Sequence, residues 1–251
     1  MGSLDGKVIV VTGAGRGLGQ VVMGRLVGEG AQVAAIGRDA ARLAGATRPL
    51  GGGAVPFAGD LGVTADVDAV FEAIEDRFGR IDGLVNNAAV YDVFEIEEAD
   101  PERIRASVNS NLIAPMLCTR KAVPLLRKSG GGDIINISSE AALHPYNLLS
   151  AYAATKAGLD GFSRAMRGEL EADNIRVSTL RLGTMRGTGT SMSPETAKRL
   201  MERNAATLQT VMGGGMMELE SVAGMVLTLL TLPADLSCEQ IDLGPSGMPP
   251  R

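Results

Sequence analysis

The chain has 251 residues, a length that one α/β domain can reach and that can bury a single large core. Its formal net charge of -5 argues against a nucleic-acid-binding protein, which would need a basic patch. The two cysteines, Cys118 and Cys238, are far apart, which excludes a disulfide framework and favours a reducing compartment. The sequence has no signal-peptide pattern, no apolar run long enough to span a bilayer and no metal-ligand spacing of His, Cys, Asp and Glu. We therefore expect a cytoplasmic protein with no metal, membrane or nucleic-acid partner.

Short apolar runs alternate with helical patterns along the chain. The runs predict strands at Lys7–Thr12, Gln32–Ile36, Ala54–Ala58, Gly83–Asn86, Asp133–Ile137, Ile175–Leu182 and near Gln240–Leu243. Helices are predicted at Leu18–Glu29, Thr64–Phe78 with Thr64 as N-cap, Pro101–Arg127 as one helix or two, Ser150–Ala172 and Ser221–Leu232. This alternation predicts an α/β fold: a single Rossmann-type domain over residues 1–251, a doubly wound parallel sheet with helices on both faces. Ligands of such sheets bind at the carboxyl ends of the strands.

A glycine-rich turn follows the first strand, with Gly13, Gly17 and Gly19 in the pattern Gly-x-x-x-Gly-x-Gly. Glycines let the backbone turn sharply and approach a pyrophosphate, and the free N–H groups of the following helix favour an anion there. An ordinary strand-to-helix turn is the alternative, but the position between a buried strand and a helix favours a dinucleotide. The predicted cofactor contacts of this turn are Gly13, Gly15, Arg16, Gly17, Leu18 and Gly19.

Together with Thr12, this turn resembles the phosphate loop of the short-chain dehydrogenase/reductase family, Thr-Gly-x-x-x-Gly-x-Gly. The resemblance continues in order along the chain: Asn86-Asn87-Ala88-Ala89 is similar to the family's Asn-Asn-Ala-Gly, and further matches are Asn111, Ser139, Tyr152 and Lys156. It implies an oxidoreductase that moves a hydride between a nicotinamide cofactor and a secondary alcohol or ketone. It also implies a homotetramer or dimer, and cofactor contacts from Asp60, Leu61, Asn87, Ala88 and Ala89.

The end of the second strand bears on the choice of cofactor. An acidic residue there would favour NAD, whereas an arginine would accommodate the 2′-phosphate of NADP. In this sequence Gly37 occupies the position where an acidic residue would lie, and Arg38 follows it. A guanidinium suits phosphate because its planar fork allows paired charge-assisted bonds, and Arg16 is a second candidate. We predict NADP(H) as the preferred cofactor, with NAD(H) as the alternative because Asp39 lies next in sequence.

The candidate reacting groups are Tyr152 and Lys156, which lie on one face of a predicted helix because four positions separate them. A nearby ammonium should lower the pKa of the tyrosine and make it a usable acid/base. By resemblance, Tyr152 exchanges the proton with the substrate oxygen, and Lys156 holds the nicotinamide ribose. Ser139 donates a hydrogen bond to that oxygen, with Ser138 as its competitor. Asn111, by the same resemblance, supports a water-linked proton path behind Lys156.

The sequence departs from the family after the sixth strand, where Leu182-Gly183-Thr184 replaces the usual Pro-Gly segment and its later threonine. Gly183 and Thr184 are the predicted cofactor contacts, with Thr188 as an alternative hydroxyl. Residues 184–217 are predicted to form a substrate lid that contains Met185, Met192, Met201, Met212, Met216 and Met217. Methionine adapts to irregular apolar shapes, so these residues fit a lipophilic substrate, and they fit ordinary helix packing equally well.

Two other functions remain open at this point. One is an NAD(H)-dependent dehydrogenase of the same family, and the other is a catalytically silent dinucleotide sensor on the same fold. Fold does not fix function, but a sensor has no need for a serine, a tyrosine and a lysine together.

Overall fold

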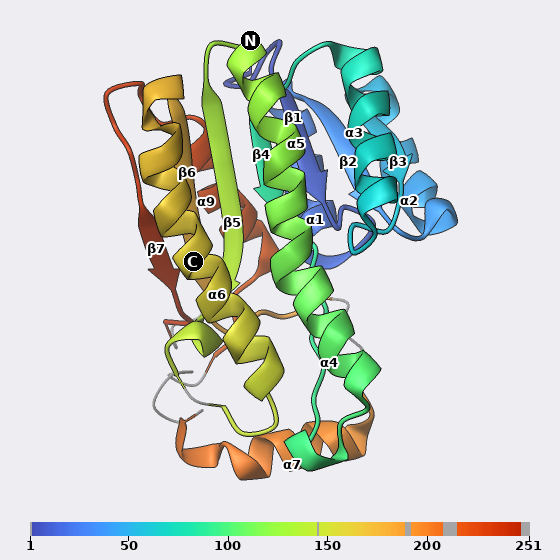
Figure 1. The fold of residues 1–251 in the computed structure, drawn as a ribbon, viewed down its shortest axis with the longest axis vertical. Coiled ribbons are helices and arrows are strands. Elements are labelled where there is room, and N and C mark those ends of the chain that lie inside the picture. The colour runs from blue at the N-terminus through green and yellow to red at the C-terminus, as the bar shows by residue number, and fades with distance from the viewer. Residues whose placement is uncertain (1, 145, 189–191, 208–214, 247–251) are drawn as a thin grey trace.

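Seven parallel strands form one sheet at the centre of the computed structural model, in the order β3-β2-β1-β4-β5-β6-β7 (Figure 1). Residues 2–144, 146–188, 192–207 and 215–246 are described. The strands are β1 (Val8–Thr12), β2 (Gln32–Gly37), β3 (Ala54–Ala58), β4 (Gly83–Asn86), β5 (Gly132–Ser139), β6 (Ile175–Leu182) and β7 (Gln240–Leu243). The predicted strands are thus all present, with small differences at their ends.

Helices cover both faces of the sheet. The bounds are α1 (Gly17–Gly28), α2 (Ala40–Thr47), α3 (Thr64–Phe78), α4 (Pro101–Val108), α5 (Ala114–Lys128), α6 (Ser150–Leu170), α7 (Pro194–Arg203) and α9 (Leu219–Leu230). Successive side chains of β1 point to opposite faces of the sheet, so the core has two parts. Ile9 and Val11 pack with α1 and α9, whereas Val8 and Val10 pack with α3 and α5. The predicted doubly wound α/β fold is confirmed.

The strand order reverses at β1, which positions the functional site. Val10 pairs with Ala34 of β2 on one side and with Leu84 of β4 on the other. Because the chain winds away from β1 in both directions, the loops after β1 and β4 separate at the carboxyl edge and leave room for a ligand.

Two details differ from the predictions, and a third decides between one helix and two, the alternatives predicted for Pro101–Arg127. The helices α2 and α7 were not predicted: α2 has only eight residues, and α7 has ten residues of strongly polar sequence, so neither stands out as an apolar segment. The assignment of Thr64 as N-cap is wrong: Val63 is the N-cap residue, and its side chain accepts no hydrogen bond. Val63 N donates to Asp60 O at 2.9 Å, and this turn precedes the start of α3 at Thr64. The segment Pro101–Arg127 forms two α-helices joined by a π-helical turn, Asn109–Ile113.

The predicted lid, 184–217, is described over 184–188, 192–207 and 215–217. Its helix α7 lies across the lower end of the molecule in Figure 1. Asn204 fixes this helix to the loop before α6, because its Oδ1 accepts from Asn147 N at 2.7 Å and its Nδ2 donates to Asn147 O at 3.1 Å. Arg199 and Arg203 both pair with Glu95 from the loop before α4.

No helix within the described parts of the chain combines the length and the hydropathy that crossing a bilayer requires.

Candidate active site

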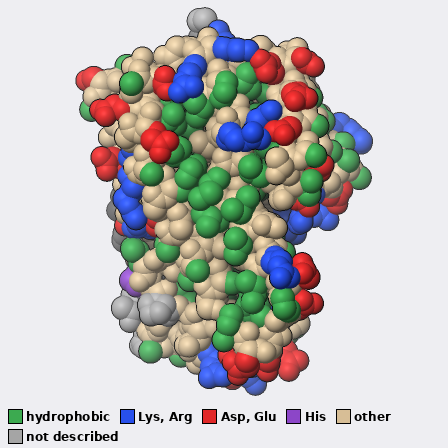
Figure 2. Space-filling model, viewed as in Figure 1, with side chains coloured by type: hydrophobic (Ala, Val, Ile, Leu, Met, Phe, Trp, Pro, Cys, Tyr) green, Lys and Arg blue, Asp and Glu red, His purple; other side chains and the backbone are tan. Residues whose placement is uncertain are grey.

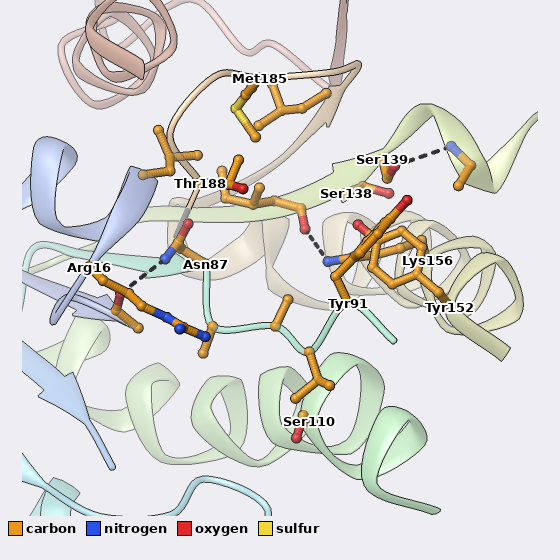
Figure 3. Close-up of a pocket in the computed structure, with 18 of the residues that line it drawn as sticks. Arg16, Asn87, Tyr91, Ser110, Ser138, Ser139, Tyr152, Lys156, Met185 and Thr188 are labelled. Atoms are coloured by element: carbon orange, nitrogen blue, oxygen red, sulfur yellow. Dashed lines mark hydrogen bonds between the residues drawn. The ribbon is translucent and has the colours of Figure 1, made fainter. Parts of the chain in front are cut away.

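A cavity of about 650 Å³ runs along the carboxyl edge of the sheet, between the ends of β2, β1, β4, β5 and β6 and the lid. Figure 3 shows its two ends: Arg16 and Asn87 lie on one side, and Ser139, Tyr91, Tyr152 and Lys156 on the other. Most of the predicted site residues line this cavity, namely Gly13, Gly15, Arg16, Leu18, Gly37, Arg38, Asp60, Leu61, Asn87, Ala88, Ala89, Ser139, Tyr152, Lys156, Gly183 and Thr184. Thr188, the alternative hydroxyl, lines it as well.

Gly17, Gly19 and Asn111 are predicted site residues that do not line the cavity. Gly19 brings α1 against β1: a Cβ there would overlap the Gly13 carbonyl oxygen and lie 2.5 Å from Nδ2 of Asn87. Gly17 has a positive φ of 55°, and a Cβ there would overlap the Thr188 carbonyl oxygen. These two glycines therefore shape the turn through close packing.

The phosphate turn and the Asn-Asn-Ala segment are joined by hydrogen bonds. Thr12 Oγ1 accepts from the backbone N–H groups of Asn87 and Ala88, both at 2.9 Å. In return, Nδ2 of Asn87 donates to Thr12 O at 2.9 Å. The ends of β1 and β4 thus form one rigid floor for the middle of the cavity.

At the end of the cavity next to β2 and β3, two carboxylates are already paired. Asp39 caps α2, because its Oδ1 accepts from Arg42 N at 2.9 Å, and it also forms a 3.4 Å ion pair with the Arg42 side chain. Arg38 lies 3.8 Å from Asp60. The guanidinium groups of Arg38 and Arg42, both more than half exposed, line this end together with Arg16.

At the other end, α6 carries Tyr152 and Lys156 one turn apart, and both line the cavity. Lys156 Nζ donates to Ile137 O at 2.7 Å and lies 5.8 Å from the centre of the Tyr152 ring. Burial lowers the pKa of Lys156 to about 8, and the charge of Asp160 opposes this shift.

The expectation that Lys156 lowers the pKa of Tyr152 is wrong in this structure. Burial raises the pKa of Tyr152 to about 12, a hydrogen bond with Ser139 lowers it in part, and the charge of Glu140 raises it. The reason is geometric: the ammonium donates to a backbone carbonyl and faces the ring of the tyrosine. Tyr152 is therefore protonated at neutral pH.

The two adjacent serines have different surroundings. Ser139 lies close enough to Tyr152 to lower its pKa, and its Oγ accepts from Ala141 N at 3.2 Å. Ser138 is 3% exposed, and its Oγ has no partner among the described residues. The geometry thus pairs Ser139, and not Ser138, with the tyrosine.

Asn111 is fully buried in the π-helical turn between α4 and α5. Its Oδ1 accepts from Val90 N at 2.7 Å, and its Nδ2 donates to Val90 O at 2.8 Å. The side chain thus holds the loop after β4, which carries Ala88, Ala89 and Tyr91 into the cavity. The π-turn is the local feature that aims Asn111 at this loop.

Several lining residues were not predicted. The three tyrosines of the chain, Tyr91, Tyr146 and Tyr152, all line the cavity, and the rings of Tyr91 and Tyr152 meet edge to face at 5.0 Å. Glu140 lies beside them, with Tyr146 as its hydrogen-bond partner. A signal was present in the sequence, since aromatic residues make up only 3% of the chain, and Tyr91 and Tyr146 lie in the loops that follow two predicted strands.

The methionines of the lid divide into two groups. Met185, Met192, Met201 and Met216 line the cavity, and Met217 packs against the core under α1 and α9. Met212 lies outside the described residues. The four lining methionines give the cavity an apolar wall.

Known proteins share both the sequence pattern and the fold. A family model described as short chain dehydrogenase matches residues 7–206. Ketoacyl reductase HetN of Nostoc sp. is 34% identical over 192 residues, which are 75% of this chain and 67% of that protein. The L-sorbose reductase of Gluconobacter frateurii, solved with NADPH and L-sorbose, is 29% identical with a TM-score of 0.84, over 99% of this chain and 100% of that one. A 3-ketoacyl-(acyl-carrier-protein) reductase of Brucella melitensis, solved with NADH, is 28% identical with a TM-score of 0.83, over 97% of this chain and 98% of that one. The chain therefore belongs to the short-chain dehydrogenase family of oxidoreductases.

Proposed function

We propose that this protein is an NADP(H)-dependent oxidoreductase that interconverts a secondary alcohol and a ketone, with Tyr152 as the acid/base. The observation that carries the proposal is the shared cavity. One end holds Tyr152, Ser139 and Lys156, and the other begins at the glycine turn in front of α1. Hydride transfer from a dinucleotide requires a turn that binds the pyrophosphate and reacting groups that act on the substrate, and both must line the same cavity.

The residues present fit a dinucleotide. At Gly13 a Cβ would lie 2.9 Å from the Cα of Ala88, so glycine keeps open a backbone cradle at the start of α1. The N–H groups and the positive dipole end of α1 favour a pyrophosphate in this cradle. In the proposed complex, Lys156 holds the nicotinamide ribose, and Gly183 and Thr184 contact the nicotinamide amide.

The arrangement around α2 supports NADP(H) over NAD(H). Asp39, the carboxylate that could bind an adenosine ribose, is engaged as the cap of α2 and in the ion pair with Arg42. Arg38 and Arg42 present guanidinium groups at the same end, which suit a 2′-phosphate. The similar proteins include one solved with NADPH and one solved with NADH, so family membership alone does not decide the cofactor.

The cofactor assignment is tested by kcat/KM for NADPH and for NADH in the wild type and in Arg38→Ala. Because Arg38→Ala removes one charge-assisted phosphate contact, we expect kcat/KM for NADPH to fall about tenfold or more, while kcat/KM for NADH changes little. A wild type that prefers NADH, with the preference kept in Arg38→Ala, would contradict the assignment.

The bound cofactor supplies or accepts the hydride, and the chain's residues position the substrate and move the proton. Because the pKa of Tyr152 is about 12, the phenol is protonated at neutral pH and is ready to donate its proton to the substrate oxygen during reduction. Ser139 donates a second hydrogen bond to the same oxygen and fixes its position. In the oxidation direction, Tyr152 takes up the proton of the substrate hydroxyl as a phenolate, the less populated form in this buried site.

The acid/base role is tested by Tyr152→Phe, which removes only the hydroxyl. We expect unchanged NADPH binding and a loss of kcat of about 10²-fold or more, since positioned acid/base groups contribute about 10²- to 10⁴-fold. Ser139→Ala should also lose activity, whereas its neighbour Ser138→Ala should keep most of it. NADPH fluorescence measures binding and absorbance measures turnover of a panel of secondary alcohols. Near-normal turnover in Tyr152→Phe would refute the assignment, and NADPH binding without turnover of any wild-type substrate would favour the sensor.

We also propose that the protein is a homo-oligomer. Hydrophobic side chains gather on the face over α5 and α6 (Figure 2). Met116 and Val123 of α5 and Phe162 and Met166 of α6 are only partly buried. A second copy that packs on these two helices would cover them.

A further inference from the structure

The carboxylate of Glu140 is the feature of the reacting end that the proposed function does not use. Glu140 follows Ser139 directly, in the turn Glu140–Ala142 after β5. Its Oε1 accepts a hydrogen bond from Tyr146 Oη at 2.8 Å. Its Oε2 lies next to Gly183, where a Cβ would come within 2.8 Å of it, and no described residue donates a hydrogen bond to Oε2.

Glu140 forms no ion pair with a lysine or arginine among the described residues. Burial raises the pKa of its carboxyl, and the hydrogen bond from Tyr146 and the charge of His144 oppose that shift. The other carboxylates that line the cavity, Asp39 and Asp60, follow β2 and β3 and are paired with Arg42 and Arg38. Lys156, the ammonium of the reacting end, donates to the backbone of Ile137. A half-buried carboxylate with one unoccupied oxygen loses part of its hydration without full compensation, so a donor brought in by a ligand would stabilise it.

The position of this carboxylate is close to the reaction. Its neighbour Ser139 lies close to Tyr152, and after burial the charge of Glu140 also raises the pKa of Tyr152 and of Tyr91. Tyr146 holds Oε1, which fixes the carboxylate and leaves Oε2 as the acceptor beside Gly183. The methionine wall of the lid lies on the same cavity.

We propose that Glu140 is a specificity residue, and that its Oε2 accepts a hydrogen bond from a hydroxyl or ammonium group that the substrate carries next to its reacting carbon. The apolar remainder of the substrate packs on Met185, Met192, Met201 and Met216. The preferred substrates are therefore amphiphilic hydroxy or amino alcohols and the matching ketones, and a carboxylate at the same position is repelled. This inference rests on the proposed oxidoreductase function.

The test compares four alcohols on one eight-carbon chain with NADP⁺ as the acceptor: 2-octanol, 1,2-octanediol, 1-amino-2-octanol and 2-hydroxyoctanoate. The wild type should prefer the diol or the amino alcohol to 2-octanol by about tenfold or more in kcat/KM, since the free energy of a hydrogen bond to a charged group corresponds to a ratio of that size. The hydroxy acid should be the poorest substrate. In Glu140→Val the preference should fall to about one, and the hydroxy acid should improve relative to 2-octanol.

Glu140→Gln separates the two kinds of donor. The amide keeps an acceptor oxygen of the same size but no charge, so it should retain most of a preference for the diol and lose a preference for the amino alcohol. The Kd of NADP⁺, measured by calorimetry, should be the same in the wild type and both variants. Thermal unfolding of the NADP⁺ complexes checks that the variants are folded.

Two results would overturn the proposal. The first is a wild type that does not distinguish the donor-bearing alcohols from 2-octanol, or a preference that survives in Glu140→Val. The second is a weaker Kd for NADP⁺ in Glu140→Val together with an equal loss for all four alcohols, which would assign Glu140 to the nicotinamide amide. If the wild type oxidises none of the four, the proposed reaction fails on this chain length. Saturation-transfer NMR on the NADP⁺ complex then decides on Glu140: stronger binding of the diol or amino alcohol than of 2-octanol, lost in Glu140→Val, supports the proposal, and equal binding overturns it.

Discussion

Burial at the reacting centre moves two pKa values in opposite directions. The pKa of Tyr152 rises to about 12 and that of Lys156 falls to about 8, because both charged forms lose hydration. Lys156 is 3% exposed, and the charge of Asp160, four residues further along α6, opposes its shift. The site thus favours a neutral tyrosine that donates a proton, beside an ammonium that burial destabilises.

The shift of Lys156 predicts a pH dependence of the free energy of unfolding. The folded-state pKa of about 8 lies below the ordinary value of 10.5, so between these values the unfolded chain binds more protons and stability rises with pH. From pH 7.5 to 9.5 we expect the wild type to gain about 2 kcal/mol relative to Lys156→Met, which lacks the titrating group. Urea unfolding at the two pH values measures this difference, and parallel pH profiles of the two proteins would show that Lys156 is not shifted.

At the scale of elements, two glycines of α1, Gly19 and Gly24, differ in how closely other atoms pack around them. Its first turn must approach β1 closely, and Gly19 makes this approach possible against Gly13 and Asn87. Gly24 lies in the same helix, but a Cβ there would have no atom within 4 Å. One helix thus contains a glycine that packing requires and a glycine that it does not.

These two positions give a matched pair of variants. Gly19→Ala should destabilise the fold by about 1–3 kcal/mol and weaken NADPH binding, because the added methyl group overlaps backbone atoms of the phosphate turn. Gly24→Ala should stabilise the fold by about 0.5–1 kcal/mol, since alanine loses less backbone entropy in a helix, and should leave NADPH binding unchanged. Urea unfolding and NADPH titration measure both effects. The packing argument is wrong if Gly19→Ala matches Gly24→Ala in either measurement.

At the scale of the whole molecule, the sheet supplies a fixed edge, and the segment predicted as a lid lines the cavity along this edge. The lid is tied to the body by Asn204 at Asn147 and by the ion pairs of Arg199 and Arg203 with Glu95. The exposed side of α5 and α6 lies outside this closure, and its partly buried apolar side chains remain for a second copy to cover.

The oligomer prediction concerns this outer face. Size-exclusion chromatography with light scattering should give a mass of two or four chains, because a stable interface between copies buries about 1,200 Å² or more. Phe162→Asp should shift the protein toward the monomer, since it places a charge in the apolar contact. Ile96→Asp, an exposed apolar position outside α5 and α6, is the control and should leave the mass unchanged. A wild type that runs as a monomer at micromolar concentration would exclude the assembly.

Much of the candidate site followed from local sequence. The predicted turn from Gly13 to Gly19, the Asn87 segment and the Tyr152–Lys156 pair all meet at one cavity or pack directly behind it. Such features are readable because each depends on backbone conformation or on spacing within one element. The hold of Asn111 on Val90 was not readable, since it depends on how a side chain orients in the folded chain. The cap of α2 by Asp39 is a local feature, but the short helix that it starts was not predicted.

The sequence by itself determined the parallel sheet and the positions of its strands, because runs of apolar residues must be buried, and it determined the family motifs at the strand ends. Only the tertiary structure decided the chemical surroundings of those motifs. It placed Glu140, Tyr146 and Tyr91 around Tyr152, and it turned the ammonium of Lys156 toward a carbonyl. The physical reason is that burial and charge act through space, so a pKa depends on neighbours that come from loops after different strands.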